Sequence, residues 1–324
     1  MSATDRDVFP ETLLFNLSID GIIFPNTVSA KLTHTFNSAR VLTVSFVGQE
    51  SLDLCRLGAE VELSWGRGNL SNLIDDKKFI GIIKDIQPKP DFSTFTAMDF
   101  TTLLAESQFV QFKPQDYIGE DLYFAAAKAC NYKGIDVSRL TRGSGLMITK
   151  DMDLFGWKTR KEFIDACFDE MKWRYAIRSG KVMDFFLSDE SNTVTSFPYV
   201  EVSIDEENII NSGVVSKIDT TRLINAITVV SSDDEDIYVQ LEDSGSQKRY
   251  GVVSKFISYK SKDRNELEDV AYKLLNRFKE PTISYTLSLS NFDNMDLGDI
   301  VEIDMPSLPK ATREAVIGYE VNYS

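Results

Sequence analysis

The sequence predicts a mixed α+β protein that is mainly β, with β-rich modules at both ends and a small α+β domain between them. Short segments with alternating apolar and polar residues recur along both ends, and turn residues separate them about every ten positions. Helical periodicity is confined to the middle and to one later segment. A length of 324 residues with 43% hydrophobic content suffices for two or three cores. We therefore expect domains at residues 1–110, 111–200 and 201–324.

The first segment has the features of a small β-barrel or sandwich. In "LLFNLSIDGIIF", Asp20-Gly21 is a strong two-residue hairpin signal between two strand-like runs. Asn37, Ser38 and Ala39 form a polar turn between "VSAKLTHTF" and "RVLTVSFVG". Further alternating runs, "AEVELSW" and "KFIGIIKDIQPKP", follow. Many short strands with frequent turns are typical of such folds.

Two helices and a hairpin are predicted in the middle segment. The alanine-rich residues 119–130 favour a helix, and residues 159–173 favour a second one. Thr159 with Glu162 forms a capping box at the start of the second helix. The hairpin follows in "WRYAIRSGKVMDFFL", which turns at Ser179-Gly180.

The second of these helices is expected to bury one face in a small core. Phe163, Cys167 and Met171 repeat every four residues, which places them on one side of a helix. Trp157 and Trp173 bracket the helix, a position where large rings commonly seal a small core. We therefore predict that Phe163, Trp157 and Trp173 are core residues.

Strands return in the last segment, interrupted by one well-marked helix. Asp263 and Glu266 form a capping-box pair, and Pro281 ends the helical pattern. The apolar stripe of this helix is expected to be core; it comprises Leu267, Val270, Ala271, Leu274, Leu275 and Phe278. The predicted strands are "SGVVSKIDT", "INAITVVSS", "IYVQLED", "YGVVSKFISY", "TISYTLSLS", "DIVEID" and "EAVIGYEVNY".

The stretch "NFDNMDLGDIVEIDMP" allows two interpretations, a calcium loop or a turn. A calcium loop with Gly298 at its sixth position needs oxygen ligands at its first, third and fifth positions. That register supplies Asp293, but then Met295 and Leu297. A turn at Gly298 and Asp299 that leads into an alternating strand fits better.

Composition narrows the possible functions. A net charge of −15 argues against general duplex binding, because phosphates are neutralised by Lys and Arg. An acidic channel wall would instead let a polyanion pass without sticking, although solubility alone also accounts for the charge. The chain has no apolar run of the roughly 18 residues that a membrane helix needs, and its start lacks the pattern of a secretion signal. We therefore expect cytosolic folding, no membrane partner, and buried thiols at Cys55, Cys130 and Cys167 rather than disulfides or a metal site.

Residues typical of enzymes are scarce. The single histidine, His34, lies in a strand-like segment without a nearby nucleophile, which limits zinc binding and acid-base catalysis. We therefore expect no catalytic residue, metal or cofactor. Two alternatives remain: a cell-wall hydrolase that uses Asp233 with Asp236, and a sugar-binding protein that uses Trp65 or Trp157.

The order of segments resembles the baseplate hub proteins of contractile-tailed bacteriophages, the late control D family. The resemblance covers nearly the whole chain, and short stretches carry it. These are "FIGIIKDI" with "FTAMDFTTLLAES", "WKTRKEFIDACFDEMKWRYAIRSGKVMDFF", the helix at 263–279, and "YTLSLSNFDNMDLGDIVEIDMP". In that family the last stretch is a strand, a Gly-Asp turn and a strand, which Gly298 and Asp299 match.

The resemblance implies a structural protein without catalytic residues. It implies two tail-tube-like β-barrels per chain, so that a homotrimer forms a ring of six barrels between the tail tube and the central spike. The implied partners are the tail tube protein, a separate central spike protein, the tape-measure protein and the baseplate wedge proteins. DNA would pass through the channel without specific binding. The implied location is the baseplate of the virion tail, assembled in the host cytoplasm.

Overall fold

The structure is a computed structural model, and its contacts divide the chain into two compact units. It describes residues 13–67, 77–106, 114–138, 144–148, 159–171, 173–178, 181–186, 201–204, 209–232, 234, 236–259, 261–289, 295–303 and 312–323. The first unit comprises Met1–Ile204 with Asn291–Ser324, and the second comprises Asp205–Ser290. The C-terminal segment predicted from the sequence therefore contributes strands to both units, and the predicted three-domain division stays a prediction.

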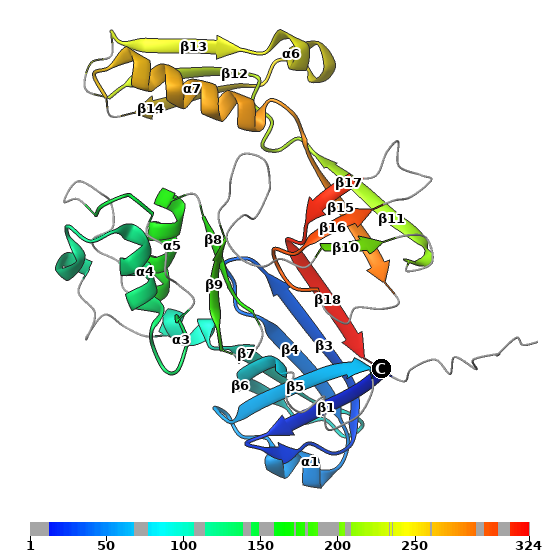
Figure 1. The fold of residues 1–324 in the computed structure, drawn as a ribbon. Helices are drawn as coiled ribbons and strands as arrows, with labels where there is room; N and C mark the ends of the chain where they lie inside the picture. The colour runs from blue at the N-terminus through cyan, green and yellow to red at the C-terminus, as the bar shows by residue number, and fades with distance from the viewer. Residues whose placement is uncertain are drawn as a thin grey trace, which may run out of the picture. The chain divides into compact units, whose positions relative to one another are not determined.

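An eight-stranded antiparallel sheet dominates the first unit (Figure 1). Its order is β18-β3-β4-β7-β6-β5-β1-β2. The strands are β1 (Leu13–Ile19), β2 (Ile22–Ile23), β3 (Thr27–Thr35), β4 (Val41–Phe46), β5 (Glu60–Arg67), β6 (Lys77–Gln87), β7 (Ser93–Asp99) and β18 (Gly318–Tyr323). The pairing of β18 with β3 joins distant parts of the sequence, and Figure 1 shows the two strands side by side.

The predicted turns of this sheet are confirmed by their backbone angles. Asp20 and Gly21 have φ values of 50° and 77° between the paired strands β1 and β2. These positive values suit a tight hairpin in which both central residues are left-handed. Asn37, with φ 57°, leads the turn between β3 and β4.

One face of the sheet carries its core. In β4, Leu42, Val44 and Phe46 are fully buried, and the residues between them are half-buried, as expected of a strand with one core face. Phe24 and Phe95 complete an aromatic group with Phe46, and the ring centroids of Phe24 lie 5.2 Å and 5.6 Å from those of Phe46 and Phe95. A short helix, α1 (Gln49–Leu54), follows β4.

A smaller α+β region follows in the same unit. It comprises α3 (Thr101–Glu106), the 3-10 turn η2 (Pro114–Tyr117), α4 (Leu122–Cys130), α5 (Arg160–Met171), β8 (Arg174–Ile177) and β9 (Met183–Phe186). At the start of α5, the Thr159 N–H donates to Glu162 Oε2 at 3.1 Å, and the Glu162 N–H donates to Thr159 Oγ1 at 3.2 Å. The predicted capping box is therefore confirmed. The predicted hairpin is the antiparallel pair β8 and β9, and residues 179–180 lie outside the described residues.

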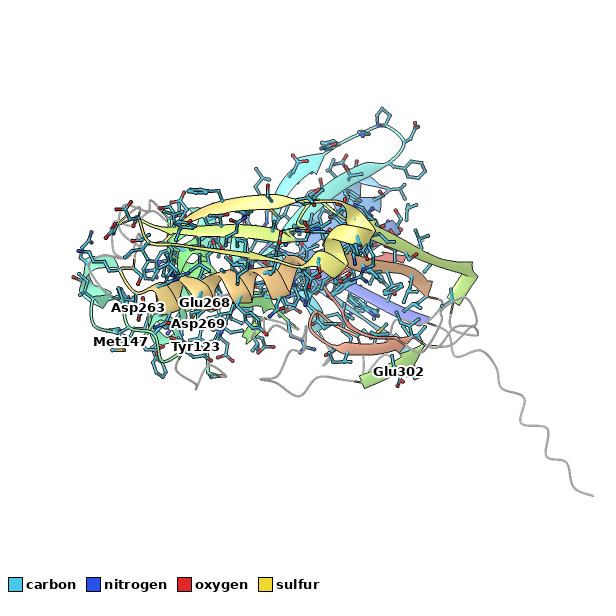
Figure 2. The ribbon with its side chains drawn as sticks, turned by 90° about the horizontal axis from the view of Figure 1, so that it is seen from above. Tyr123, Met147, Asp263, Glu268, Asp269 and Glu302 are labelled. Atoms are coloured by element: carbon cyan, nitrogen blue, oxygen red, sulfur yellow. The ribbon has the colours of Figure 1, made fainter. Side chains whose placement is uncertain are left out.

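A three-stranded sheet completes the first unit. Strand β10 (Glu201–Ile204) runs parallel to β16 (Ile300–Ile303), which is antiparallel to β17 (Thr312–Ala315). In β16, Ile300, Val301 and Ile303 are buried and Glu302 is exposed (labelled in Figure 2).

The described residues of the second unit form two sheets and two helices. Strands β11 (Ile209–Asp219) and β15 (Thr282–Leu289) pair antiparallel. The other sheet has the order β13-β12-β14, from β12 (Ala226–Ser231), β13 (Tyr238–Glu242) and β14 (Ser254–Tyr259). Between β13 and β14 lies α6 (Ser244–Tyr250), and α7 (Arg264–Phe278) follows β14.

The stripe predicted for α7 is confirmed as core, but its cap differs in detail. Leu267, Ala271 and Leu275 are buried against β12 and β13. Asp263 caps the helix by accepting the Asn265 N–H at 2.9 Å. Glu266 does not reach the Asp263 N–H directly. Instead it accepts the Ser261 hydroxyl at 2.5 Å, and the Ser261 Oγ accepts the Asp263 N–H at 3.0 Å, so a serine relays the capping box.

The fold is mixed α+β and mainly β, as predicted. The two-barrel arrangement stays a prediction, because the described strands form one eight-stranded sheet and several smaller ones. Among the described residues, no helix is both long and apolar enough to cross a membrane.

Candidate functional site

The Gly298 turn packs its tip into the first unit and leads into β16. Gly298 has φ 83°, and its N–H donates to the Val316 carbonyl at 2.9 Å. Leu297 is fully buried near Ala176. Asp293 lies outside the described residues, and within the described ranges no three His, Cys, Asp or Glu side chains are grouped to hold a metal ion. The described part of this stretch thus has the geometry of a turn.

Two carboxylates of this turn bind one arginine from the β8-β9 hairpin. Arg178 Nη2 lies 2.9 Å from Asp299 Oδ1, and Arg178 Nε lies 3.6 Å from Asp296 Oδ2. The Asp296 N–H also donates to Asp299 Oδ2 at 2.8 Å, so Asp299 orders the turn from inside. Asp299 is fully buried. The Gly-Asp pair therefore attaches the turn to a hairpin that is distant in sequence.

A second ion pair, between Arg40 and Asp99, is fully enclosed within the first unit. Both side chains have 0% exposure, and Arg40 Nε lies 3.3 Å from Asp99 Oδ2. Asp99 also accepts the Arg40 and Thr101 backbone N–H groups at 3.0 Å and 2.9 Å. Arg40 Nη1 donates to the Lys78 carbonyl at 2.5 Å. Burial of two charges is tolerated because the remaining polar atoms have partners as well.

His34 lies between these charges and β18. Its Nδ1 is 3.6 Å from Asp296 Oδ1, longer than a normal hydrogen bond, and its ring packs edge-on against Tyr319 with centroids 5.4 Å apart. Burial lowers the pKa of His34 below its ordinary value, and attraction to Asp296 offsets only part of this shift. Burial raises the pKa of Tyr319, and the Asp296 charge adds to that effect.

The pKa of Asp296 shifts in the opposite sense to that expected from burial alone. Burial acts to raise this pKa, but His34, Arg40 and Arg178 together lower it. Asp296 is therefore held as a carboxylate among cations. We call the group His34, Arg40, Asp99, Arg178, Asp296, Asp299 and Tyr319 the charged cluster.

The low pKa of His34 predicts a pH dependence of stability. An imidazole that binds its proton more weakly when folded favours the unfolded state as the pH falls through its ordinary value of 6.5. We expect the free energy of unfolding to fall by up to about 1.4 kcal/mol per pH unit below that value. In His34→Phe, which keeps a ring against Tyr319, this slope should disappear.

Urea denaturation at several pH values between about 7 and 5 measures this slope. A difference in slope between the wild type and His34→Phe reports on His34 alone, because His34 is the only histidine of the sequence. An equal slope in the wild type and in His34→Phe would contradict the assignment. Below this window, Asp296 adds a separate loss of stability as the pH falls through and below its ordinary value of 3.8.

The charged cluster has the character of a structural junction. Its members come from β3, the start of β4, the end of β7, the end of β8, the Gly298 turn and β18. Its charged groups face opposite charges, which holds segments from both ends of the sequence in one unit. Sequence reasoning missed Arg40, Asp99, Arg178 and Asp296, because nothing in their local sequence distinguishes them from surface charges.

The other predicted residues lie in several places. Phe163 is fully buried in the core of the small α+β region, and Trp173 packs at the margin of this core with its ring 5.4 Å from that of Tyr123. Tyr123 is labelled in Figure 2. Trp157 and Asp233 lie outside the described residues. Trp65 is 6% exposed and belongs to the core of the eight-stranded sheet.

The three cysteines are free thiols. Cys130 and Cys167 are buried, and Cys55 is half-buried. Burial raises the pKa of Cys55 to about 11 and that of Cys167 to about 12, and it also raises the pKa of Cys130. All three are therefore protonated at neutral pH. The predicted burial is confirmed for Cys130 and Cys167, whereas Cys55 is half-buried.

Neither protein-family models nor curated protein sequences match the chain. Several solved structures, however, are similar to the chain. A tail protein from Neisseria meningitidis MC58 superposes with a TM-score of 0.68 at 13% identity, covering 96% of this chain and 92% of the other. The 43 kDa tail protein of prophage MuSo2 from Shewanella oneidensis gives 0.66 at 11% identity, with 96% and 94% covered. The chain has the fold of phage tail proteins.

A third structure extends the range of this tail-protein fold. The prophage tail protein gp18 from Listeria monocytogenes EGD-e superposes with a TM-score of 0.54 at 13% identity, covering 95% of this chain and 90% of that one. The likeness concerns the path of the backbone along nearly the full length of each protein. At such identities it assigns no role to individual side chains of the charged cluster.

Proposed function

We propose that this chain is a structural hub protein of a phage tail baseplate. In this proposal, three copies form a pseudo-sixfold ring that connects the tail tube to the central spike and encloses a channel for DNA. The observation that carries the proposal is the tail-protein fold, which extends over 96% of the chain. The late control D resemblance of the sequence supports the hub role within that fold.

The charge of the chain supports a channel that does not retain DNA. Asp and Glu outnumber Lys and Arg by 50 to 35. Acidic side chains on a channel wall repel phosphates, so a polyanion passes without specific binding. In this proposal the tail tube protein, the tape-measure protein, the central spike protein and the baseplate wedge proteins are the partners.

A non-enzymatic role agrees with the charged cluster and with the tail-protein fold. Arg40, Asp99, Arg178 and Asp299 are engaged with one another inside the first unit, where they stabilise the fold. The sugar-binding alternative loses Trp65, whose ring is enclosed in a core and cannot stack on a sugar. The hydrolase alternative gains no supporting observation, since Asp236 is exposed and Asp233 lies outside the described residues.

Mass photometry of the full chain tests the proposal, first alone and then with the central spike protein of the same phage. We expect a species of three times the 36.6 kDa chain mass, and a larger complex when the spike is added. Electron microscopy of that complex should then show a ring around a channel. A chain that stays monomeric under both conditions contradicts the proposal. Clearing of peptidoglycan in a zymogram would instead favour the hydrolase.

A further inference from the structure

The three-stranded sheet of the second unit has one covered face and two free edges. Helix α7 covers one face, where Ile227, Val229 and Val239 pack against the helix. Figure 2 labels the N-cap residue Asp263 and the helix residues Glu268 and Asp269, and all three are exposed. Strands β13 and β14 form the two edges, and neither pairs with another described strand on its outer side. Such edges carry unpaired backbone groups that can pair with another chain.

The two edges carry opposite charges. Asp234 and Asp236 precede β13, and Glu242 ends it. On the opposite edge, Lys255 lies near the start of β14 and Lys262 follows its end. All five side chains are exposed, and none forms an ion pair with another described residue. Glu242 accepts a hydrogen bond from the neutral Gln247 amide at 3.3 Å, which leaves its charge uncompensated.

These charges also lie at matching levels of the sheet. Ala226 of β12 pairs with Glu242 on one side and with Ser254, next to Lys255, on the other. At the other end of the sheet, Val230 pairs with Tyr238 and with Ser258. Asp236 precedes β13 at that end, and Lys262 lies in the connection from β14 to α7. If the two edges met without a shift in level, Glu242 and Lys255 would lie at the same end of the contact, with Glu242 on the face opposite α7 and Lys255 on the face that α7 covers.

Exposed aromatic side chains add to this complementarity. Phe256 is 67% exposed and Tyr238 is 57% exposed. Thr228 pairs with both Gln240 and Phe256, so Phe256 lies on the same face as Gln240 and Tyr238, opposite α7. On joined edges, Phe256 and Tyr238 would be diagonal neighbours, within reach of aromatic contact. Joining the edges would bring the two exposed aromatic side chains together and cover part of their apolar surface.

We propose that β14 of one copy pairs antiparallel with β13 of the next copy, and this proposal rests on the homotrimer proposed above. The strand directions agree, because β12 is parallel to β14 and antiparallel to β13. When a second copy is placed beside β14 by rotation about an axis along the strands, its β13 therefore runs antiparallel to β14 of the first copy. Two different edges that meet form a head-to-tail contact, which closes into a ring under cyclic symmetry. A second copy is the occupant because the complementary charges lie on the two edges of one sheet.

Charge reversal in the full chain tests this contact. Glu242→Lys and Lys255→Glu each bring two like charges to the same end of the contact, although on opposite faces of the sheet, and we expect each to raise the dissociation constant of the trimer at least about threefold. The double variant restores opposite charges and should return close to the wild-type value. The matched controls are Glu268→Lys and Lys273→Glu on the exposed side of α7, which change the net charge equally and should leave association unchanged. Mass photometry at one fixed salt concentration gives the dissociation constants.

A cysteine pair gives a second, direct readout. Tyr238 and Ser258 lie on opposite sides of β12, about 9.6 Å apart as two strand spacings, which is too far for a disulfide within one copy. Oxidised Tyr238→Cys/Ser258→Cys should therefore give covalent dimers and trimers. The control pair Tyr238→Cys/Ser254→Cys, at opposite ends of the sheet, should not.

The outcomes separate this proposal from the hub proposal. The edge contact is overturned if the wild type is a trimer, neither charge reversal weakens that trimer, and oxidised Tyr238→Cys/Ser258→Cys forms no crosslink. The homotrimer would then still stand. A monomeric wild type overturns both. Weakening by each reversal, recovery in the double variant and selective crosslinking together support the edge contact.

Discussion

Replacement of Asp99 by alanine is expected to lower the free energy of unfolding by about 3–5 kcal/mol, among the largest effects of any single substitution in the chain. The variant leaves the Arg40 guanidinium buried without its carboxylate, and it removes the acceptor of the Arg40 and Thr101 N–H groups. The cost follows because a buried charge that loses its partner keeps its full desolvation penalty. Urea denaturation followed by circular dichroism measures the change.

An exposed ion pair in the same sheet provides the control. Lys31 and Glu320 join β3 to β18 at 2.8 Å, but their side chains are 51% and 45% exposed. Solvent screens such a pair, so Lys31→Ala should cost no more than about 1 kcal/mol. If Asp99→Ala cost as little as Lys31→Ala, the charged cluster would have no role in holding the first unit together.

Phe163→Ala is expected to cost about 3–5 kcal/mol, through a cavity in the core of the small α+β region. Phe163 is fully buried on α5, and its ring centroid lies 5.9 Å from that of Tyr117. Loss of the ring removes apolar contact on one face of the helix, and close-packed neighbours fill the space only in part. Thermal and urea denaturation should both show the loss.

Phe124→Ala on α4 is the matched control for this cavity. Phe124 is the same residue type on a neighbouring helix, but it is 42% exposed. Its truncation leaves a smaller void and should cost clearly less than that of Phe163. Equal costs at the two positions would mean that the predicted core of α5 does not stabilise this region.

Local signals predicted the elements whose structure depends on neighbouring residues. Asp20-Gly21 predicted a hairpin because few other pairs adopt two positive φ values, and the structure has that hairpin. The stripe of Leu267, Ala271 and Leu275 predicted the buried face of α7 because helical periodicity depends on local spacing. The short helix α6 was missed: its residues "SGSQKRY" have no apolar periodicity, and it is defined by Asp243, which accepts the Ser246 N–H at 2.8 Å.

Long-range partners could not be predicted in this way. Arg40 and Asp99 each have the local sequence of an exposed charge, and only the pairing of β4 with β7 brings them together. His34 was predicted to have no catalytic role, and no signal in its strand pointed to Asp296 or Tyr319. The opposite charges of β13 and β14 became visible only when the register placed them at the same levels.

The position of β18 has a consequence for synthesis of the protein on the ribosome. Strand β3 emerges early, but its partner on that side, Gly318–Tyr323, is translated only after the whole of the second unit. Until then the nascent sheet presents an open edge, which other chains can join at high local concentration. Closure also requires contact between residues far apart in sequence, which slows folding. Production of this protein should therefore benefit from slow translation and low temperature, and truncation before Gly318 should yield aggregates rather than a smaller folded product.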